Sequence, residues 1–144
     1  MVAGKRVLDF AAGCGLAGIA AARAGASRVE AAEIDPFAAA AIHLNADLNG
    51  VAIEVCENDL VGAANPGWEV VLAGDVCYER PMAEAVEAWL KGLAAAGTLV
   101  LLGDPGRSYL PKAGLERVVA YAVKTTRELE DTDVRNAVVW RLGG

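Results

Sequence analysis

The 144-residue sequence has few positive charges and no long apolar run. Thirteen Lys and Arg residues stand against nineteen Asp and Glu residues, which gives a net charge of -6. Proteins that bind nucleic acid normally present a basic face to the phosphates, so we expect no nucleic acid partner. A membrane span needs roughly 18–20 consecutive apolar residues, and no stretch approaches that length. We therefore expect a soluble protein with no membrane partner.

Cysteine and histidine are also scarce, and neither indicates a metal site. Cys14, Cys56 and Cys77 lack metal-ligand spacing and are expected to be reduced, with Cys14 in a packing or lining role. His43, the single histidine, is interpreted as structural or surface-exposed. The N-terminal residues pass directly into a predicted strand, which is not typical of a signal or transit peptide. The cytoplasm is therefore the expected location, and no metal is expected.

The stretch from Val7 to Gly18 organises the rest of the chain. It begins as an apolar strand that contains Asp9, and glycines follow at positions 13, 15 and 18. This Gly-x-Gly-x-x-Gly pattern is typical of a strand that turns sharply into a helix beneath a bound nucleotide. Taken alone, the pattern does not identify the ligand.

Charge narrows the class of ligand. Between Leu8 and Ala22 the sequence has no Lys, Arg, Ser or Thr to hold a diphosphate. Asp9 instead places a carboxylate beside the turn, which favours the ammonium and sulfonium groups of S-adenosylmethionine. Glu33 follows the next strand about twenty residues later and is expected to accept hydrogen bonds from the ribose hydroxyls. Asp59 follows the third strand and suits either an adenine amino group or a turn.

Helices and strands alternate along the first two thirds of the chain. The pattern predicts strands over 5–10, 28–32, 51–55, 69–74 and 98–103, and helices over 16–24, over 36–49 and from about residue 81. Asp35 and Pro36 are typical of a helix N-cap and first helical position. A buried stripe is expected on the second helix, formed by Phe37, Ala41, Leu44 and Leu48.

The last third is predicted to end in a hairpin. A short helix is expected over 112–120, and two strands over 121–128 and 134–142 must pair antiparallel because their connection is short. The whole chain, residues 1–144, is therefore expected to form one α/β domain. Its predicted architecture is a three-layer, Rossmann-like sandwich around a mostly parallel seven-stranded sheet with a C-terminal antiparallel hairpin.

Three stretches resemble class I S-adenosylmethionine-dependent methyltransferases. They are Asp-Phe-Ala-Ala-Gly-Cys-Gly at 9–15, Gly-Asp-Val-Cys-Tyr-Glu at 74–79 and Gly-Asp-Pro-Gly-Arg-Ser-Tyr-Leu-Pro at 103–111. Together they are most similar to the bacterial lysine methyltransferases of the electron transfer flavoprotein β subunit. Those relatives have helical elements before the first strand, which this chain is expected to lack because its strand begins at about Lys5.

The resemblance implies roles for particular residues. The cofactor would contact a set formed by Asp9, Ala11, Gly13, Gly15, Glu33, Ile34, Asp59, Leu60 and Asp75, where Ala11 stands in place of the first glycine of many members. Asp75 and Tyr78, in an Asp-x-x-Tyr motif, would be the catalytic residues that orient the substrate amine. The implied reaction is N-methylation of a lysine in a protein substrate, with the electron transfer flavoprotein β subunit as the candidate.

Several alternatives stay open at this stage. Methylation of a ribosomal protein or of a small amine shares the same cofactor half, and so does a non-catalytic fragment that only binds S-adenosylmethionine. Methylation of DNA bases is disfavoured because Val76 and Cys77 stand where its motif has two prolines. An NAD-dependent oxidoreductase is disfavoured by the acidic turn.

Overall fold

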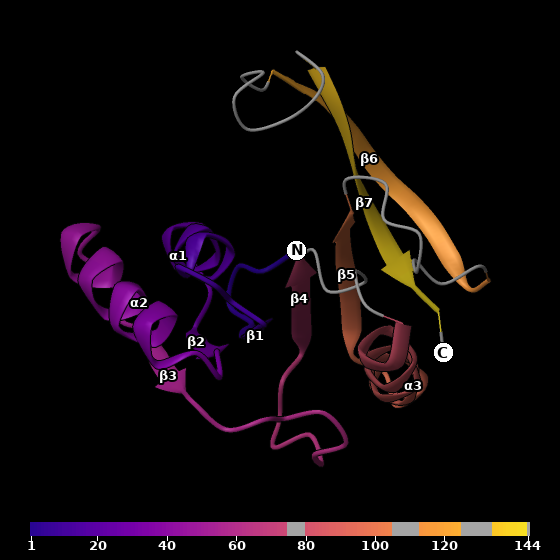
Figure 1. The fold of residues 1–144 in the computed structure, drawn as a ribbon, viewed down its shortest axis with the longest axis horizontal. Helices are drawn as coiled ribbons and strands as arrows, with labels where there is room; N and C mark the ends of the chain where they lie inside the picture. Colours follow the sequence, from indigo (N-terminus) through magenta and orange to yellow (C-terminus); the bar gives the residue numbers. More distant parts are fainter. Residues whose placement is uncertain (75–79, 105–112, 125–133, 144) are drawn as a thin grey trace.

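The computed structural model describes residues 1–74, 80–104, 113–124 and 134–143, and within these ranges the chain forms one seven-stranded sheet with three helices. In chain order the elements are β1 (Arg6–Phe10), α1 (Leu16–Arg23), β2 (Arg28–Ala32), α2 (Pro36–Leu48), β3 (Glu54–Cys56), β4 (Val70–Gly74), α3 (Arg80–Ala95), β5 (Leu99–Asp104), β6 (Leu115–Lys124) and β7 (Val134–Leu142). Figure 1 shows α1 and α2 on one face of the sheet and α3 on the other. The predicted three-layer α/β architecture is confirmed.

The sheet has the strand order β3-β2-β1-β4-β5-β7-β6. Strands β1 to β5 run parallel, β7 is antiparallel to β5, and β6 is antiparallel to β7. The chain moves outward from β1 to β3 and then returns to place β4 on the other side of β1. Ligands of such sheets bind at the carboxyl ends of the strands beside this change of direction, so the topology directs attention to the turn after β1.

The main core lies between the sheet and α3. Phe10 and Trp89 meet edge to face with ring centroids 5.0 Å apart, and Trp68 packs edge to face on Trp89 at 6.3 Å. The Trp89 Nε1–H also donates to the carbonyl of Ala63 (2.9 Å). These contacts hold the segment between β3 and β4, which contains no helix over residues 57–69.

The start of α2 agrees with the sequence. Oδ1 of Asp35 accepts a hydrogen bond from the amide of Phe37 (2.9 Å), and Pro36 is the first helical residue. A side-chain acceptor at the N-cap satisfies a helix amide that has no partner within the helix. The expected N-cap is therefore confirmed.

The expected buried stripe of α2 is wrong. The buried residues are Ala39, Ile42 and Ala46, whereas the exposed large side chains of this helix are Phe37 (87%), Leu44 (69%) and Leu48 (85%). Ala41, the fourth member of the predicted stripe, is only half-buried. The helix has apolar residues on more than one side, and the face formed by Ala39, Ile42 and Ala46 is the buried one. Periodicity alone does not choose between two apolar faces.

The expected short helix over 112–120 is also wrong. Gly114 adopts a left-handed conformation (φ 77°), and β6 begins directly after it. The strand pairs antiparallel with β7 from Leu115 to Lys124, with one irregularity between Arg117 and Val119. The hydrogen-bonded ladder to β7 overrides the local helix preference, since strand formation depends on the partner strand and not only on propensity. The antiparallel pairing itself is confirmed.

None of the helices within the described ranges combines the length and the apolar character that a membrane crossing would require.

Candidate functional site

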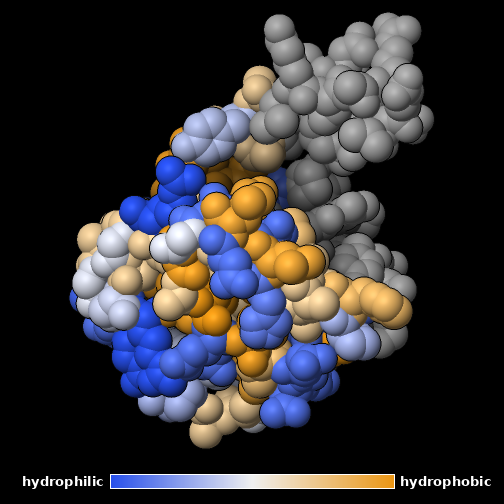
Figure 2. Space-filling model, turned by 90° about the vertical axis from the view of Figure 1, so that its left-hand side faces the viewer, coloured by the Kyte–Doolittle hydropathy of each residue, from blue (hydrophilic) through white to orange (hydrophobic). Residues whose placement is uncertain are grey.

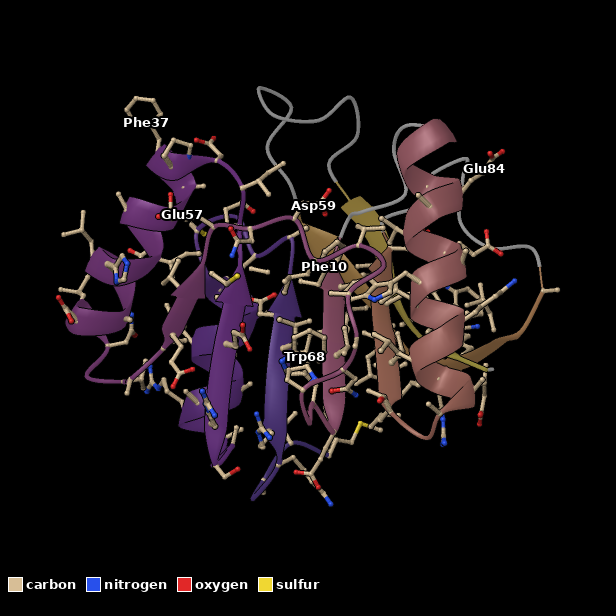
Figure 3. The ribbon with its side chains drawn as sticks, turned by 90° about the horizontal axis from the view of Figure 1, so that it is seen from below. Phe10, Phe37, Glu57, Asp59, Trp68 and Glu84 are labelled. Carbon is tan, nitrogen blue, oxygen red and sulfur yellow. The ribbon has the colours of Figure 1, made fainter. Side chains whose placement is uncertain are left out.

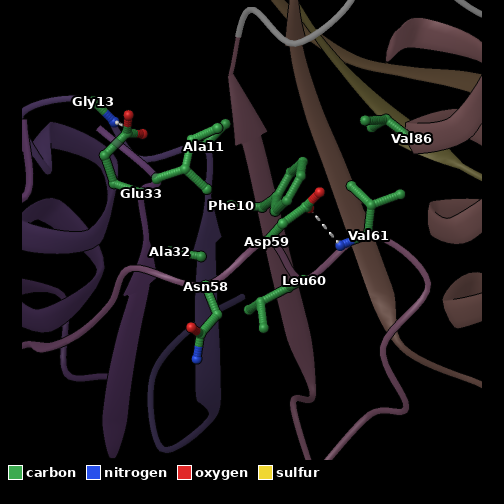
Figure 4. Close-up of a pocket in the computed structure, with 11 residues that line it drawn as sticks. Phe10, Ala11, Gly13, Ala32, Glu33, Asn58, Asp59, Leu60, Val61 and Val86 are labelled. Atoms are coloured by element: carbon green, nitrogen blue, oxygen red, sulfur yellow. Dashed lines mark hydrogen bonds between the residues drawn. The ribbon is translucent and has the colours of Figure 1, made fainter. Parts of the chain in front are cut away.

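A cavity of about 340 Å³ opens at the carboxyl ends of the central strands. Its wall combines the strand ends, the segments that follow them and one helix: Phe10, Ala11, Gly13, Ala32, Glu33, Ile34, Asn58, Asp59, Leu60, Val61 and Val86. Figure 4 shows these side chains converging from both sides of Phe10. Small-molecule sites typically enclose roughly 300–1,000 Å³ and have mostly apolar walls with a few polar groups, so the cavity is large enough for a nucleoside-sized ligand.

The turn after β1 is built from left-handed residues. Gly13 and Gly15 have φ angles of 59° and 87°, and Ala11 has a φ of 53° although it carries a side chain. No atom lies within 4 Å of a Cβ placed on Gly13, so a ligand can approach the backbone there. Gly15 lies behind the turn instead, where a Cβ would stand 3.1 Å from Cγ2 of Ile42. Gly13 therefore lines the cavity, and Gly15 allows α2 to pack against the turn.

Glu33 joins the turn to the end of β2. Its Oε2 accepts a hydrogen bond from the amide of Gly13 (3.1 Å), and its own amide donates to the carbonyl of Cys56 at the end of β3 (2.9 Å). Figure 4 shows the carboxylate beside Gly13 at the cavity wall. A carboxylate can accept several hydrogen bonds at once, so this one retains capacity for a pair of hydroxyl groups.

Asp9 lies beneath the turn and is not one of the cavity-lining residues. Its side chain is buried, and Oδ2 accepts a hydrogen bond from the amide of Gly18 in α1 (2.8 Å). Burial raises the pKa of Asp9 from 3.8 to about 7, against the opposing effect of the Gly18 hydrogen bond, and the nearby charge of Glu33 raises it further. Asp9 thus fastens the start of α1 to β1.

Asp59 makes a turn contact and also lines the cavity, so it fits both of the roles that the sequence left open. Its Oδ1 accepts a hydrogen bond from the amide of Val61 (3.0 Å), which is a turn contact. The same residue lines the cavity together with Leu60. The turn contact holds the segment after β3 in place, and its other carboxylate oxygen has no hydrogen bond to the described residues (Figure 4).

Most of the residues predicted to contact a cofactor converge on the cavity. Those that line it are Ala11, Gly13, Glu33, Ile34, Asp59 and Leu60. Asp9 and Gly15 support the turn from behind, and their direct contact with a cofactor stays a prediction. Asp75 and Tyr78 lie outside the described residues.

Five lining residues were not predicted: Phe10, Ala32, Asn58, Val61 and Val86. Phe10 and Ala32 are the last residues of β1 and β2, so the rule that ligands bind at strand carboxyl ends would have found them. Val86 lies in α3, far along the chain from the other lining residues. No local sequence pattern indicates that its side chain reaches the cavity.

Cys14 differs from the expectation of a packing or lining role. It is exposed and does not belong to the cavity wall, although its carbonyl accepts a hydrogen bond from Nδ2 of Asn45 (2.9 Å). Cys14 and Cys56 are free thiols, and Cys77 lies outside the described residues. In the part of the chain that the structure describes, no group of three or more His, Cys, Asp or Glu side chains is placed to hold a metal ion.

Comparison with known proteins finds consistent similarity. A family profile described as ribosomal protein L11 methyltransferase (PrmA) matches residues 1–103. The electron transfer flavoprotein beta subunit lysine methyltransferase of Danio rerio is 37% identical over 145 residues, which cover 96% of this chain and 56% of that protein. The Homo sapiens protein of the same name is 35% identical, with 97% of this chain and 56% of that protein covered. The chain thus spans about half the length of these relatives.

A solved structure supports the fold assignment. The Pyrococcus abyssi tRNA (uracil-54, C5)-methyltransferase, solved in complex with S-adenosyl-L-homocysteine, superposes with a TM-score of 0.72. It is 16% identical, and the match covers 98% of this chain and 35% of that chain. At this identity the likeness concerns the fold, which is the same α/β architecture that the strand order indicates.

Proposed function

The chain belongs to the ribosomal protein L11 methyltransferase (PrmA) family, and on that basis we propose that it binds S-adenosylmethionine and transfers the methyl group to a lysine amine of a protein. The observation that carries the proposal is the position of Glu33. Its carboxylate meets the amide of Gly13 at the wall of the cavity, between the ends of β1 and β2.

The chain's own residues suit this cofactor. Glu33 would accept hydrogen bonds from the two ribose hydroxyls, while Ile34 and Leu60 would pack against the adenine ring and Asp59 would accept from its amino group. The carboxylate of Glu33 favours a cation over a diphosphate at this turn. S-adenosylmethionine would supply an activated methyl group on a positively charged sulfur.

The chemistry needs little from the protein beyond position and proton control. A free lysine amine has a pKa near ~10.4, so the site must favour its neutral form through desolvation or a nearby positive charge. Asp75 and Tyr78, in the segment that follows β4, would orient the neutral amine toward the methyl group by hydrogen bonds. In-line displacement then depends mainly on this alignment.

The favoured substrate is the electron transfer flavoprotein β subunit, because the relatives that match over almost the whole chain carry that activity in their names. A second candidate is ribosomal protein L11, which the matching family profile names over residues 1–103. A cytoplasmic location belongs to the same proposal.

Calorimetric titration tests the cofactor half. S-adenosylhomocysteine should bind the chain with a 1:1 stoichiometry, whereas NAD should give no heat. Glu33→Gln keeps an acceptor for the Gly13 amide but loses a charged acceptor for ribose, so we expect affinity to fall by about tenfold. Asp47→Asn, on the exposed part of α2, is the matched control and should bind normally. Binding of NAD alone would overturn the proposal.

Transfer of a tritiated methyl group tests the substrate half. The chain is incubated with labelled S-adenosylmethionine and, separately, with the electron transfer flavoprotein β subunit or ribosomal protein L11. Label on a lysine of the first protein supports the favoured substrate, and label on L11 supports the second. Asp75→Ala and Tyr78→Phe should lower the rate by at least about a hundredfold, measured for each variant at saturating S-adenosylmethionine, if these residues orient the amine. An unchanged rate in both variants would refute their role.

A further inference from the structure

Two large apolar side chains lie exposed at the edge of the sheet where the cavity opens. Ile34 lines the cavity and is 69% exposed, and Phe37, in the first turn of α2, is 87% exposed. Figure 3 shows the Phe37 ring projecting away from the molecule at this edge. A phenylalanine side chain offers roughly 150–250 Å² of area to a partner, so Phe37 is suited to anchor one.

Carboxylates surround these two side chains. Residues 11–15, 33–37 and 57–62, which follow β1, β2 and β3, include Glu33, Asp35, Glu57 and Asp59 but no Lys, Arg or His. Glu57 is exposed and lies next to Glu33, because the amide of Glu33 donates to the carbonyl of Cys56. Figure 3 shows Glu57 and Asp59 on the same edge as Phe37.

The opposite edge of the sheet has a different charge pattern. Two cations there have acidic partners: Lys5 Nζ lies 3.5 Å from Oε1 of Glu69, and Arg28 lies 2.6 Å from Oε2 of Glu54. The segments that follow β1, β2 and β3 thus carry carboxylates without a cation of their own. Electrostatic complementarity favours a cationic partner on this side of the molecule.

We propose that Ile34, Asp35, Phe37 and Glu57 form a docking rim for a segment of the protein substrate that combines basic and apolar residues. The proposal rests on the proposed function, since it assigns the surface that receives the protein whose lysine is methylated. Phe37 buries against the apolar side chains of the segment, and Ile34 extends the apolar surface from the cavity wall toward Phe37. Asp35 and Glu57 attract its Lys and Arg side chains while the target lysine approaches the methyl group of the bound cofactor.

Other occupants fit this rim less well. The carboxylates repel the phosphates of a nucleic acid. A second copy of the chain in a two-fold contact would bring the same carboxylates face to face, because the two surfaces of such an interface are identical. Like charges placed opposite one another across an interface are unfavourable. A basic protein segment satisfies both the apolar and the charged part of the rim.

The same helix provides a matched control. Leu48 is 85% exposed, almost as much as Phe37, but it lies at the other end of α2. Eleven residues of helix place the two positions roughly 16 Å apart. Figure 2 shows the side of the molecule where α2 lies, with hydrophobic side chains at the surface among hydrophilic ones. If nonspecific hydrophobic contact caused substrate binding, Phe37 and Leu48 would contribute equally to the affinity.

The test measures binding of the whole chain, saturated with S-adenosylhomocysteine, to the electron transfer flavoprotein β subunit and to ribosomal protein L11. For the protein that binds, Phe37→Ala should weaken the dissociation constant by about tenfold. Glu57→Gln should weaken it by about two- to threefold and reduce its dependence on salt. Leu48→Ala should leave it unchanged. S-adenosylhomocysteine affinity should be the same in all three variants.

The outcomes separate the two proposals. Equal affinity in the Phe37→Ala and Leu48→Ala variants, or binding that does not depend on salt, would overturn the docking rim. Absence of binding to both proteins by the unaltered chain would overturn it as well. Failure of the unaltered chain to bind S-adenosylhomocysteine would instead refute the proposed function.

Discussion

Ala11, in the turn after β1, has a backbone conformation that alanine rarely adopts. Its φ of 53° is left-handed, a conformation that costs a residue with a Cβ roughly 1–2 kcal/mol relative to the right-handed one. Many members of the family that this stretch resembles have glycine at this position, and the left-handed backbone angle explains that preference. The chain tolerates alanine because the turn is held on both sides, by Glu33 at Gly13 and by Asp9 at Gly18.

Ala11→Gly should therefore raise the free energy of unfolding by up to about 1 kcal/mol. The removed steric cost exceeds the roughly 0.5–1 kcal/mol of extra chain entropy that glycine loses on folding. Urea denaturation at fixed pH measures the change. Ala12→Gly is the control, because the φ of Ala12 is not positive, and it should lower the free energy instead. The same loss in both variants would contradict this account.

Asp9 makes the stability of the chain depend on pH. Its pKa is about 7 in the fold against an ordinary value of 3.8, so between these values the folded chain holds a proton that the unfolded chain has released. This contribution to stability is complete below about pH 4 and is lost as pH rises through 7. The full loss is at most about 4 kcal/mol.

Asp9→Asn should flatten that dependence. Asparagine still accepts a hydrogen bond from the Gly18 amide but does not ionise. Urea denaturation at pH 4.5, 6 and 8 should show a free energy of unfolding that falls with pH in the unaltered chain and falls less in the variant. Parallel pH profiles would mean that Asp9 does not titrate in this range.

At the scale of elements, α2 has two apolar faces, of which one is buried and the other lies at the surface. Ile42 is fully buried, and its side chain fills the space in front of Gly15, so the helix is packed directly against the turn. Leu44, two residues later, is 69% exposed. The sequence predicts the helix and its ends, but Phe37, Leu44 and Leu48 are exposed.

A pair of alanine substitutions on α2 tests this assignment. Ile42→Ala should lower the free energy of unfolding by about 2–4 kcal/mol because it leaves a cavity between α2 and the turn. Leu44→Ala should change it by no more than about 0.5 kcal/mol. Chemical denaturation of both variants under one set of conditions makes the comparison. A larger loss of unfolding free energy in Leu44→Ala than in Ile42→Ala would mean that the stripe predicted from the sequence is the buried one.

At the scale of the molecule, one sheet connects every described element, and its tryptophans report on different parts of it. Trp68 and Trp89 belong to the core under α3, and Trp140 lies in β7 near the far edge. The sequence predicts a single domain over 1–144, which stays a prediction. If it holds, unfolding is one cooperative transition.

Single-tryptophan variants measure that cooperativity. Each keeps one of the three tryptophans and has phenylalanine at the other two positions. Within each variant, the urea midpoint from tryptophan fluorescence should coincide with the midpoint from far-ultraviolet circular dichroism, whatever the absolute stability. An earlier fluorescence midpoint in the variant that keeps Trp140 would show that the β6–β7 hairpin unfolds separately.

The sequence alone determined the features that depend on neighbours along the chain. These are the glycine turn, the N-cap at Asp35, the parallel β-α units and the placing of carboxylates after β2 and β3. Such features follow from local backbone preferences and from the alternation of strands and helices. The predicted set of cofactor contacts was found in large part at one cavity for the same reason, since carboxyl ends of parallel strands meet at one edge.

Only the tertiary structure decided which faces and partners those elements have. It turned Phe37, Leu44 and Leu48 outward, made a strand of 115–124, set Asp9 beneath the turn and brought Val86 of α3 to the cavity. Each outcome depends on residues distant in sequence: the sheet under α2, the strand β7 beside β6, and the burial that raises the pKa of Asp9. Packing and desolvation arise from the assembled surfaces, so no local pattern contains them.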